Sequence, residues 1–252
     1  MGVHWLTAFI DHSAASAGDE LRFWQVATNS ALSARRGDRG QFATFVPSDG
    51  DAFLRVQETD SGDVGVHLDL HVDSVDNETI RSLRLGSTLI DRVDDGLAVM
   101  RSPRGMTFCL VQHHGEAQRP SPVEVSHLGV VYLLDQISID IPHDAFDDEC
   151  RFWSDLTGWP IHGGSVPEFR VLQRPDGMAL RILLQRLDDD DPATLARAHL
   201  DFAVGEHGDA IAAWHQTLGA TFARQGRRWI TLTDPAGLPY CLTERDPVTG
   251  TL

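Results

Sequence analysis

The chain contains an internal repeat, which constrains its fold more than any other feature of the sequence. Residues 67–72 read HLDLHV and residues 199–204 read HLDFAV, an offset of 132 (199 − 67). Residues 102–110 read SPRGMTFCL and residues 234–242 read DPAGLPYCL, at the same offset. Because two separate blocks share one offset, we interpret the chain as a tandem duplication. The predicted domains are residues 1–118 and 119–252.

Each copy divides again, because the order strand, helix, strands occurs twice within it. Alternating apolar residues predict the strands, and apolar residues three and four apart predict the helices. Gly86, Gly158 and Gly219 stand where glycine ends a helix. The pattern therefore predicts four βαβββ units. The expected strands are 6–10, 41–46, 52–57, 67–72, 87–92, 97–101, 107–112, 136–141, 169–173, 179–186, 199–204, 221–223, 229–233 and 240–243, and the expected helices are 19–28, 75–85, 145–157 and 209–218.

Composition excludes several classes of partner. Lys and Arg number 21 against 37 Asp and Glu, which gives a formal charge of −16. A binder of phosphate backbones gains affinity from Lys and Arg, so we expect no nucleic-acid partner and no anionic membrane. The sequence has no apolar run of about 18 residues or more and no signal-peptide pattern at its beginning, which predicts a cytoplasmic protein. Three scattered cysteines indicate reduced thiols.

The sequence resembles the vicinal oxygen chelate superfamily, which includes glyoxalase I, bleomycin resistance proteins and extradiol dioxygenases. The HLDL and HLDF segments carry the likeness, together with the turns at Pro103 and Pro235 that lead to Cys109 and Cys241. This resemblance implies an α+β fold of two tandem modules. Each module would be a pair of βαβββ units whose curved mixed sheets surround a cleft.

The resemblance also implies positions for metal ligands on the first and last strands of paired units. Carboxylates of the superfamily are replaced by cysteine in both copies, and a lone imidazole with amides supplies few strong donors. We therefore expect no cofactor, and no metal in the first copy. The alternative is a divalent metal in the second copy. The matching positions are Trp5, Gln57, His67 and Cys109 in the first copy and Gln136, Gln185, His199 and Cys241 in the second.

Alternation along the strands predicts which side chains face the cleft. Ile137 and Ile139 point to the helices, whereas Gln136 and Asp140 point the other way. The same rule puts a polar row on the repeated strands. The row consists of His67, Asp69 and His71 in the first copy and His199 and Asp201 in the second. If metal-free acid or base chemistry occurs, His67, Asp69 and His71 are the candidates for it.

Each of the other candidate ligand contacts also has a purely structural interpretation. Trp5 is either an aromatic platform for a flat ligand or a plug for the position of the metal. Arg55 and Arg181 share strand faces with Gln57 and Gln185, and they would meet an anionic group or reach solvent at the margin of the sheet. His67 and His199 are either functional or hydrogen-bond partners that fix the register of the sheet.

Three functions remain open on this basis. The leading one is binding of a small organic molecule without an obligatory metal, as in sequestration by bleomycin resistance proteins. The second is a divalent-metal-dependent lyase, isomerase or dioxygenase with its site in the second copy. The third is a pair of vestigial clefts in a protein that acts through its surface. A monomer or a homodimer fits each of them.

Overall fold

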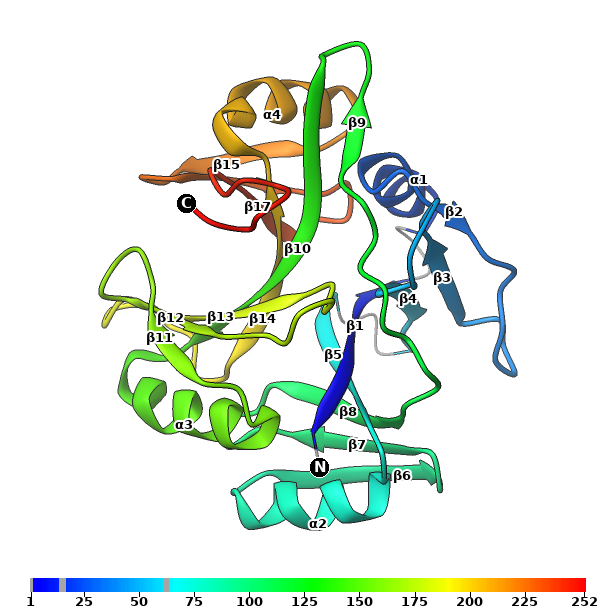
Figure 1. Ribbon diagram of the computed structural model, residues 1–252, viewed down its shortest axis with the longest axis vertical. Coiled ribbons are helices and arrows are strands. Elements are labelled where there is room, and N and C mark those ends of the chain that lie inside the picture. The colour runs from blue at the N-terminus through cyan, green and yellow to red at the C-terminus, as the bar shows by residue number, and fades with distance from the viewer. Residues whose placement is uncertain (1, 14–16, 61–63) are drawn as a thin grey trace. The chain divides into compact units, whose positions relative to one another are not determined.

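The computed structural model describes residues 2–13, 17–60 and 64–252, and Figure 1 labels their helices and strands. The first half contains β1 (Val3–His12), α1 (Ala17–Ala27), β2 (Ala31–Leu32), β3 (Phe42–Val46), β4 (Leu54–Glu58), β5 (Gly65–Val72), α2 (Val75–Arg84), β6 (Thr88–Asp94), β7 (Leu97–Arg101) and β8 (Thr107–Gln112). The second contains β9 (Val123–Val125), β10 (Val130–Ile141), α3 (Phe146–Thr157), β11 (Ile161–Gly163), β12 (Phe169–Leu172), β13 (Arg181–Arg186), β14 (Arg197–Ala203), α4 (Gly208–Thr217), β15 (Thr221–Gln225), β16 (Trp229–Thr233) and β17 (Pro239–Thr243), with short 3-10 turns at His143–Ala145 and Gly205–His207.

The strands form two mixed sheets with equivalent orders. The first runs β2-β3-β4-β1-β5-β8-β7-β6, and the second runs β11-β12-β13-β10-β14-β17-β16-β15, with β9 paired to β10. In each sheet a parallel pair, β5 with β8 or β14 with β17, adjoins antiparallel neighbours. The α+β class and the paired βαβββ units are therefore confirmed.

The two copies also agree in strand register. Asp69 pairs with Cys109 across β5 and β8, and Asp201 pairs with Cys241 across β14 and β17. Because a shift of one residue would turn every side chain to the opposite face, equal register keeps equivalent side chains on equivalent faces. The repeat in the sequence is thus a repeat in structure.

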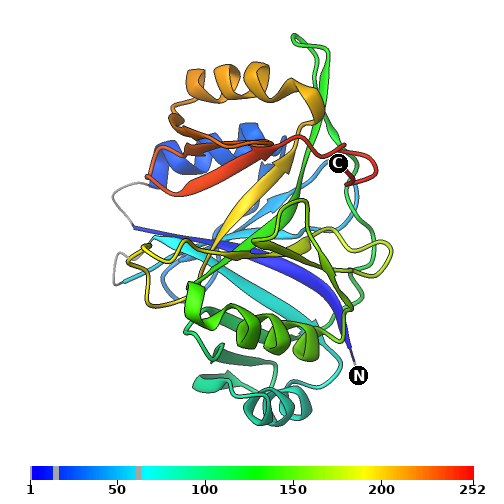
Figure 2. The same ribbon diagram turned by 90° about the vertical axis from the view of Figure 1, so that its left-hand side faces the viewer.

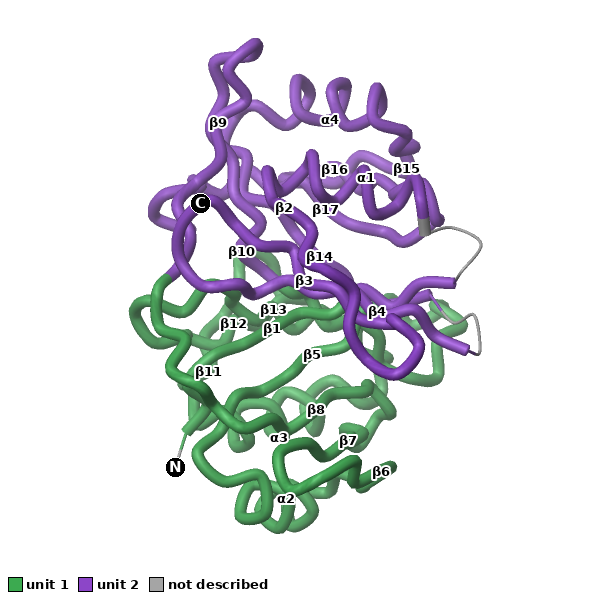
Figure 3. The backbone as a smooth tube through the Cα atoms, turned by 90° about the vertical axis from the view of Figure 1, so that its right-hand side faces the viewer, with its two compact units in different colours: residues 1–9, 66–118, 137–198 green, residues 10–65, 119–136, 199–252 purple. Residues whose placement is uncertain are grey.

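The backbone divides into two compact units, coloured separately in Figure 3. Unit 1 contains residues 1–9, 66–118 and 137–198, and unit 2 contains residues 10–65, 119–136 and 199–252. Each unit therefore combines segments from both copies. The predicted domains 1–118 and 119–252 follow the sequence repeat and stay a prediction.

The core of unit 1 is aromatic and aliphatic. The ring of Phe108 lies 5.9 Å from Phe152 and 5.3 Å from Trp153, measured between centroids. Ser74 caps the N-terminus of helix α2, because its hydroxyl accepts a hydrogen bond from the Asn77 N–H. Gly86, at φ +101°, follows the helix. A positive φ favours glycine, so the predicted end of this helix is confirmed.

The core of unit 2 is a cluster of aromatic rings around a buried histidine. Trp24 of α1 donates a hydrogen bond from Nε1 to Asp234, and its ring lies 5.7 Å from that of Tyr240. In Figure 2 α1 (blue) accordingly lies beside β17 (red). His215 of α4 lies 2.9 Å from the Tyr240 hydroxyl through Nδ1. Through these contacts α1 and α4 both pack against Tyr240 of β17.

Several boundaries differ from the sequence prediction. Strand β10 begins at Val130 and not at Gln136, because its first residues pair with β9 in a hairpin. The strand therefore begins six residues earlier than predicted. The short strands β2, β9 and β11 were not predicted, since two or three residues carry too little alternation to recognise. Among the described residues, no helix is long and apolar enough to cross a membrane.

Candidate functional site

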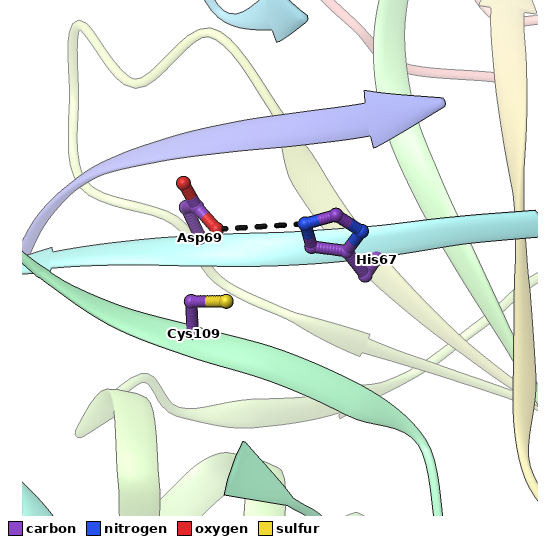
Figure 4. Close-up of side chains that lie close together, drawn as sticks. All are labelled: His67, Asp69 and Cys109. Atoms are coloured by element: carbon purple, nitrogen blue, oxygen red, sulfur yellow. Dashed lines mark ion pairs between the residues drawn. The ribbon is translucent and has the colours of Figure 1, made fainter. Parts of the chain in front are cut away.

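The polar row predicted on β5 lies on one face of that strand and is buried. His67, Asp69 and His71 alternate with Leu68 and Leu70, and all five are at least nine-tenths buried. The Nε2 atom of His67 lies 3.9 Å from Oδ1 of Asp69. A dashed line in Figure 4 joins these two side chains. The adjacent strand β8 contributes Cys109 opposite Asp69. We call His67, Asp69 and Cys109 the first His–Asp–Cys cluster.

Unit 2 contains an equivalent group, the second His–Asp–Cys cluster, formed by His199, Asp201 and Cys241. Nε2 of His199 lies 3.3 Å from Oδ1 of Asp201. Gln136 of β10 donates a hydrogen bond from its side-chain amide to the other oxygen of Asp201. Thr231 of β16 contacts the sulfur of Cys241 through its hydroxyl at 3.5 Å. This cluster is therefore linked to side chains on two neighbouring strands.

The donor atoms of each cluster suit a divalent metal ion. The imidazole nitrogen, carboxylate oxygen and cysteine sulfur of each cluster lie within 4.8 Å of one another. These are the three ligand types that Zn²⁺ accepts, and a carboxylate with a thiolate balances a charge of +2. Three protein ligands leave a further coordination position open to water or substrate. The residues present thus fit such an ion in either copy.

The carboxylate of this donor set was not among the candidate metal ligands predicted from the sequence. The predicted second-copy set joined Gln136, Gln185, His199 and Cys241, and it left Asp201 among the organic-ligand contacts. Asp201 was recognisable from two signals, its spacing of two residues from His199 on one strand and the matching HLDL segment. Gln185 belongs to unit 1, whereas Gln136, His199 and Cys241 belong to unit 2.

The remaining predicted contacts lie on strands of one unit or the other. In unit 1, Trp5 is completely buried, Asp140 lies 3.6 Å from the Arg197 guanidinium, and Arg181 is half-buried on the same strand as Gln185. In unit 2, Arg55 and Gln57 are half-buried on β4. The ligand-binding roles of these residues stay predictions.

A third group of ligand-type side chains lies in unit 1, and the sequence did not reveal it. His71, His113 and Glu116 place one nitrogen or oxygen each within 4.8 Å of one another, and we call them the two-histidine cluster. Partial burial opposes ionisation of Glu116, but the N–H groups of Glu116 and His114 and the two imidazoles hold the pKa of Glu116 below its usual range. Glu116 is therefore a carboxylate at neutral pH.

The paired βαβββ units, the mixed sheets and the position of the polar rows define a protein of the vicinal oxygen chelate superfamily. The chain belongs to the glyoxalase-like domain family, whose model matches residues 7–111 and 136–243. The two matched parts begin 129 residues apart, at Thr7 and Gln136. The RFW segments at 22–24 and 151–153 have the same offset.

Solved structures of this superfamily resemble the chain over most of its length. An Mn(II)-bound glyoxalase from Novosphingobium aromaticivorans has a TM-score of 0.66 at 13% identity, covering 99% of this chain and 85% of that protein. A mutant 4-hydroxymandelate synthase from Streptomyces coelicolor has a TM-score of 0.62 at 13% identity, with coverage of 99% and 94%. A 2,3-dioxygenase from Pseudomonas sp. KL28 has a TM-score of 0.62 at 13% identity, with coverage of 96% and 92%.

No curated protein matches the sequence significantly. At such low identity the structural likeness establishes the fold and not the reaction. These proteins do carry out different chemistry on one architecture, so the choice between activities depends on the side chains of this chain.

Proposed function

We propose that the chain binds a small polar organic molecule at the second His–Asp–Cys cluster, without an obligatory metal. The observation that supports this proposal is the bond from the Gln136 amide to the Asp201 carboxylate. With His199 at 3.3 Å from its other oxygen, this buried carboxylate has protein partners on both sides. The Asp201 carboxylate thus has polar partners within the protein itself.

The burial of the polar row supports a binding role for these side chains over a placement without function. Gln136 and Asp201 are both 2% exposed. Burying polar groups costs free energy unless they form hydrogen bonds, so an ordinary core would place apolar residues there. An imidazole that donates or accepts, beside an accepting carboxylate, suits a ligand that carries hydroxyl or carbonyl oxygens.

The first His–Asp–Cys cluster is the weaker candidate for the same role. His67 lies 3.9 Å from Asp69, beyond hydrogen-bond distance, and the ring of Phe9 stacks on His67 with centroids 4.7 Å apart. One face of this imidazole is thus covered by protein. We propose that it lines a pocket or holds the sheet register.

The second candidate function is a metal-dependent lyase, isomerase or dioxygenase. The convergence of His199, Asp201 and Cys241 within 4.8 Å favours it. An ion held by these residues would supply Lewis-acid chemistry at its open position. The chain's own contribution would be to orient Asp201 through the hydrogen bond from Gln136.

A thermal-shift screen of small hydroxylated and carbonyl compounds tests the proposal. It uses the wild-type protein, His199→Ala and, as a matched control, His207→Ala, which removes an exposed histidine of unit 2. A compound of the expected class raises the melting temperature of the wild type and of His207→Ala but not of His199→Ala. Metal analysis of the same samples, with Cys241→Ser added, separates the two candidates.

Each result of the thermal-shift screen and the metal analysis either supports or overturns the proposal. A compound that stabilises metal-free protein and requires His199 supports the proposal. Stoichiometric metal that disappears in both His199→Ala and Cys241→Ser overturns it in favour of the metal-dependent reading. If no compound binds and neither variant changes the metal content, the proposal fails and the clusters are structural.

A further inference from the structure

We propose that the two-histidine cluster is a binding site for a divalent transition-metal ion of the Zn²⁺ type, separate from both His–Asp–Cys clusters. The site would use Nδ1 of His71, Nδ1 of His113 and a carboxylate oxygen of Glu116. It does not depend on the function proposed above. All three residues belong to unit 1.

The backbone brings these side chains together through the parallel pair β5 and β8. His71 of β5 is in register with Val111 of β8, and the His113 N–H continues the ladder by donating to the Val72 carbonyl at 3.0 Å. Residues 111 and 113 are two apart and extend on one side of the sheet. Gly115, at φ +104°, then turns the chain so that Glu116 returns toward both histidines.

The distances between the ligand atoms suit a shared ion better than direct hydrogen bonds. Oε2 of Glu116 lies 3.5 Å from Nδ1 of His71 and 3.3 Å from Nδ1 of His113. Charge-assisted N–H to O bonds are shorter, about 2.7–2.9 Å. Two ligands at about 2.0–2.1 Å from a tetrahedral Zn²⁺ lie about 3.4 Å apart. The observed N···O distances of 3.3 and 3.5 Å therefore match two ligands of one ion.

Neighbouring side chains orient both imidazoles. The Thr7 hydroxyl lies 2.9 Å from Nε2 of His71, so the opposite nitrogen, Nδ1, faces Glu116. The ring of His4 stacks on His113 with centroids 4.9 Å apart, and Nε2 of His4 lies 2.9 Å from Asp73. Partners that fix the far side of a ligating histidine are typical of metal sites.

The donor set selects the class of ion. Two imidazoles and one carboxylate suit Zn²⁺, Fe²⁺, Co²⁺ or Ni²⁺, whereas Ca²⁺ and Mg²⁺ need more oxygen ligands. About a fifth of each side chain of His113 and Glu116 is exposed, at 21% and 20%, which gives an ion access from solvent. Three protein ligands would leave a position for water.

The test combines Zn²⁺ calorimetry with visible absorption of bound Co²⁺. The wild type is compared with His113→Ala, the near-isosteric Glu116→Gln and the control His114→Ala, which removes an exposed histidine beside the site. His199→Ala and Cys241→Ser report on the second His–Asp–Cys cluster. Circular dichroism establishes that each variant is folded. If His113→Ala does not fold, Glu116→Gln still tests the proposal.

We expect the wild type, His114→Ala, His199→Ala and Cys241→Ser to bind one Zn²⁺ alike at this site, and the affinity to fall at least about tenfold in His113→Ala and Glu116→Gln. Tetrahedral Co²⁺ absorption without a thiolate charge-transfer band is expected. Equal binding by wild type and Glu116→Gln, or no binding by the wild type, overturns the proposal. Binding lost only in His199→Ala and Cys241→Ser overturns it as well and instead supports the metal-dependent candidate function.

Discussion

Asp201 lies directly opposite Cys241 across the parallel strands β14 and β17, and the Gln136 amide donates to the carboxylate of Asp201 from a third strand. Replacing Gln136 with leucine keeps the approximate side-chain volume but leaves this buried carboxylate without its amide donor. An unsatisfied buried acceptor costs about 1–3 kcal/mol. We therefore expect Gln136→Leu to lower the free energy of unfolding by that amount, measured in urea by tryptophan fluorescence.

The chain offers a matched control for this substitution. Thr231 is in register with Cys241, and Val99 is in register with Cys109 in the first copy. Thr231→Val therefore introduces a residue that the equivalent position already holds, and we expect it to change stability by less than about 0.5 kcal/mol. A Gln136→Leu variant as stable as Thr231→Val would refute the importance of the amide bond.

The fold was predictable because repetition and alternation act through strand register. Phe42 pairs with Gln57 in one sheet, and Phe169 pairs with Gln185 in the other. Gln57 and Gln185, predicted as ligand contacts in different copies, therefore occupy equivalent positions in the two sheets. A periodic pattern that recurs fixes which face each residue occupies. This is why the polar rows could be placed before the structure was known.

The candidate site was less predictable because parts of it are not repeated. His71 corresponds to Ala203 and His113 to Arg245 at the offset of 132, so comparing the copies conceals the two-histidine cluster. Its assembly also depends on the turn at Gly115, which has no periodicity. Asp201 does belong to the repeated pattern, but the ligand positions implied by the superfamily resemblance fall on Gln136 and Gln185 of other strands.

His215 is predicted to make stability depend on pH. Burial lowers its pKa to about 3 from the ordinary value of 6.5. Between these values the unfolded chain binds more protons than the folded one, so stability falls as pH falls, by up to about 1.4 kcal/mol per pH unit. Urea unfolding from about pH 6.5 down to about pH 4 measures this dependence.

The variant His215→Asn should have a shallower slope over this range, whatever its stability at neutral pH. His114→Gln, which changes an exposed histidine, should keep the wild-type slope. An unchanged slope in His215→Asn would mean that other groups dominate the acid sensitivity.

Asp135 and Arg245 form a buried ion pair in unit 2, and its loss should be costly. One guanidinium nitrogen of Arg245 donates to both carboxylate oxygens of Asp135 at 2.6 and 2.7 Å, and the side chains are 0% and 5% exposed. Arg245→Ala removes both of these charge-assisted hydrogen bonds from a buried carboxylate, whose other cationic neighbour, Arg119, lies farther away at 3.7 Å. A hydrogen bond to a charged group contributes about 1.5–3 kcal/mol, and we expect Arg245→Ala to lose stability of this size in urea unfolding.

An exposed ion pair of the same unit provides the comparison. Arg228 lies 3.4 Å from Glu244, with about half of each side chain exposed. Arg228→Ala should cost less than about 1 kcal/mol, because water and salt screen such pairs. Similar losses of stability in Arg245→Ala and Arg228→Ala would contradict the expectation that the buried ion pair contributes more than the exposed one.

Cys150 should not react with thiol reagents while the protein is folded. Burial raises the pKa of Cys150 to about 12. Its thiolate fraction at pH 7 is then about 10⁻⁵, and the thiolate is the reactive form. In the double variant Cys109→Ala and Cys241→Ala, mass spectrometry should detect no labelling until urea unfolds the chain. Prompt native labelling of Cys150 would show that helix α3 opens readily and would contradict the burial of its thiol.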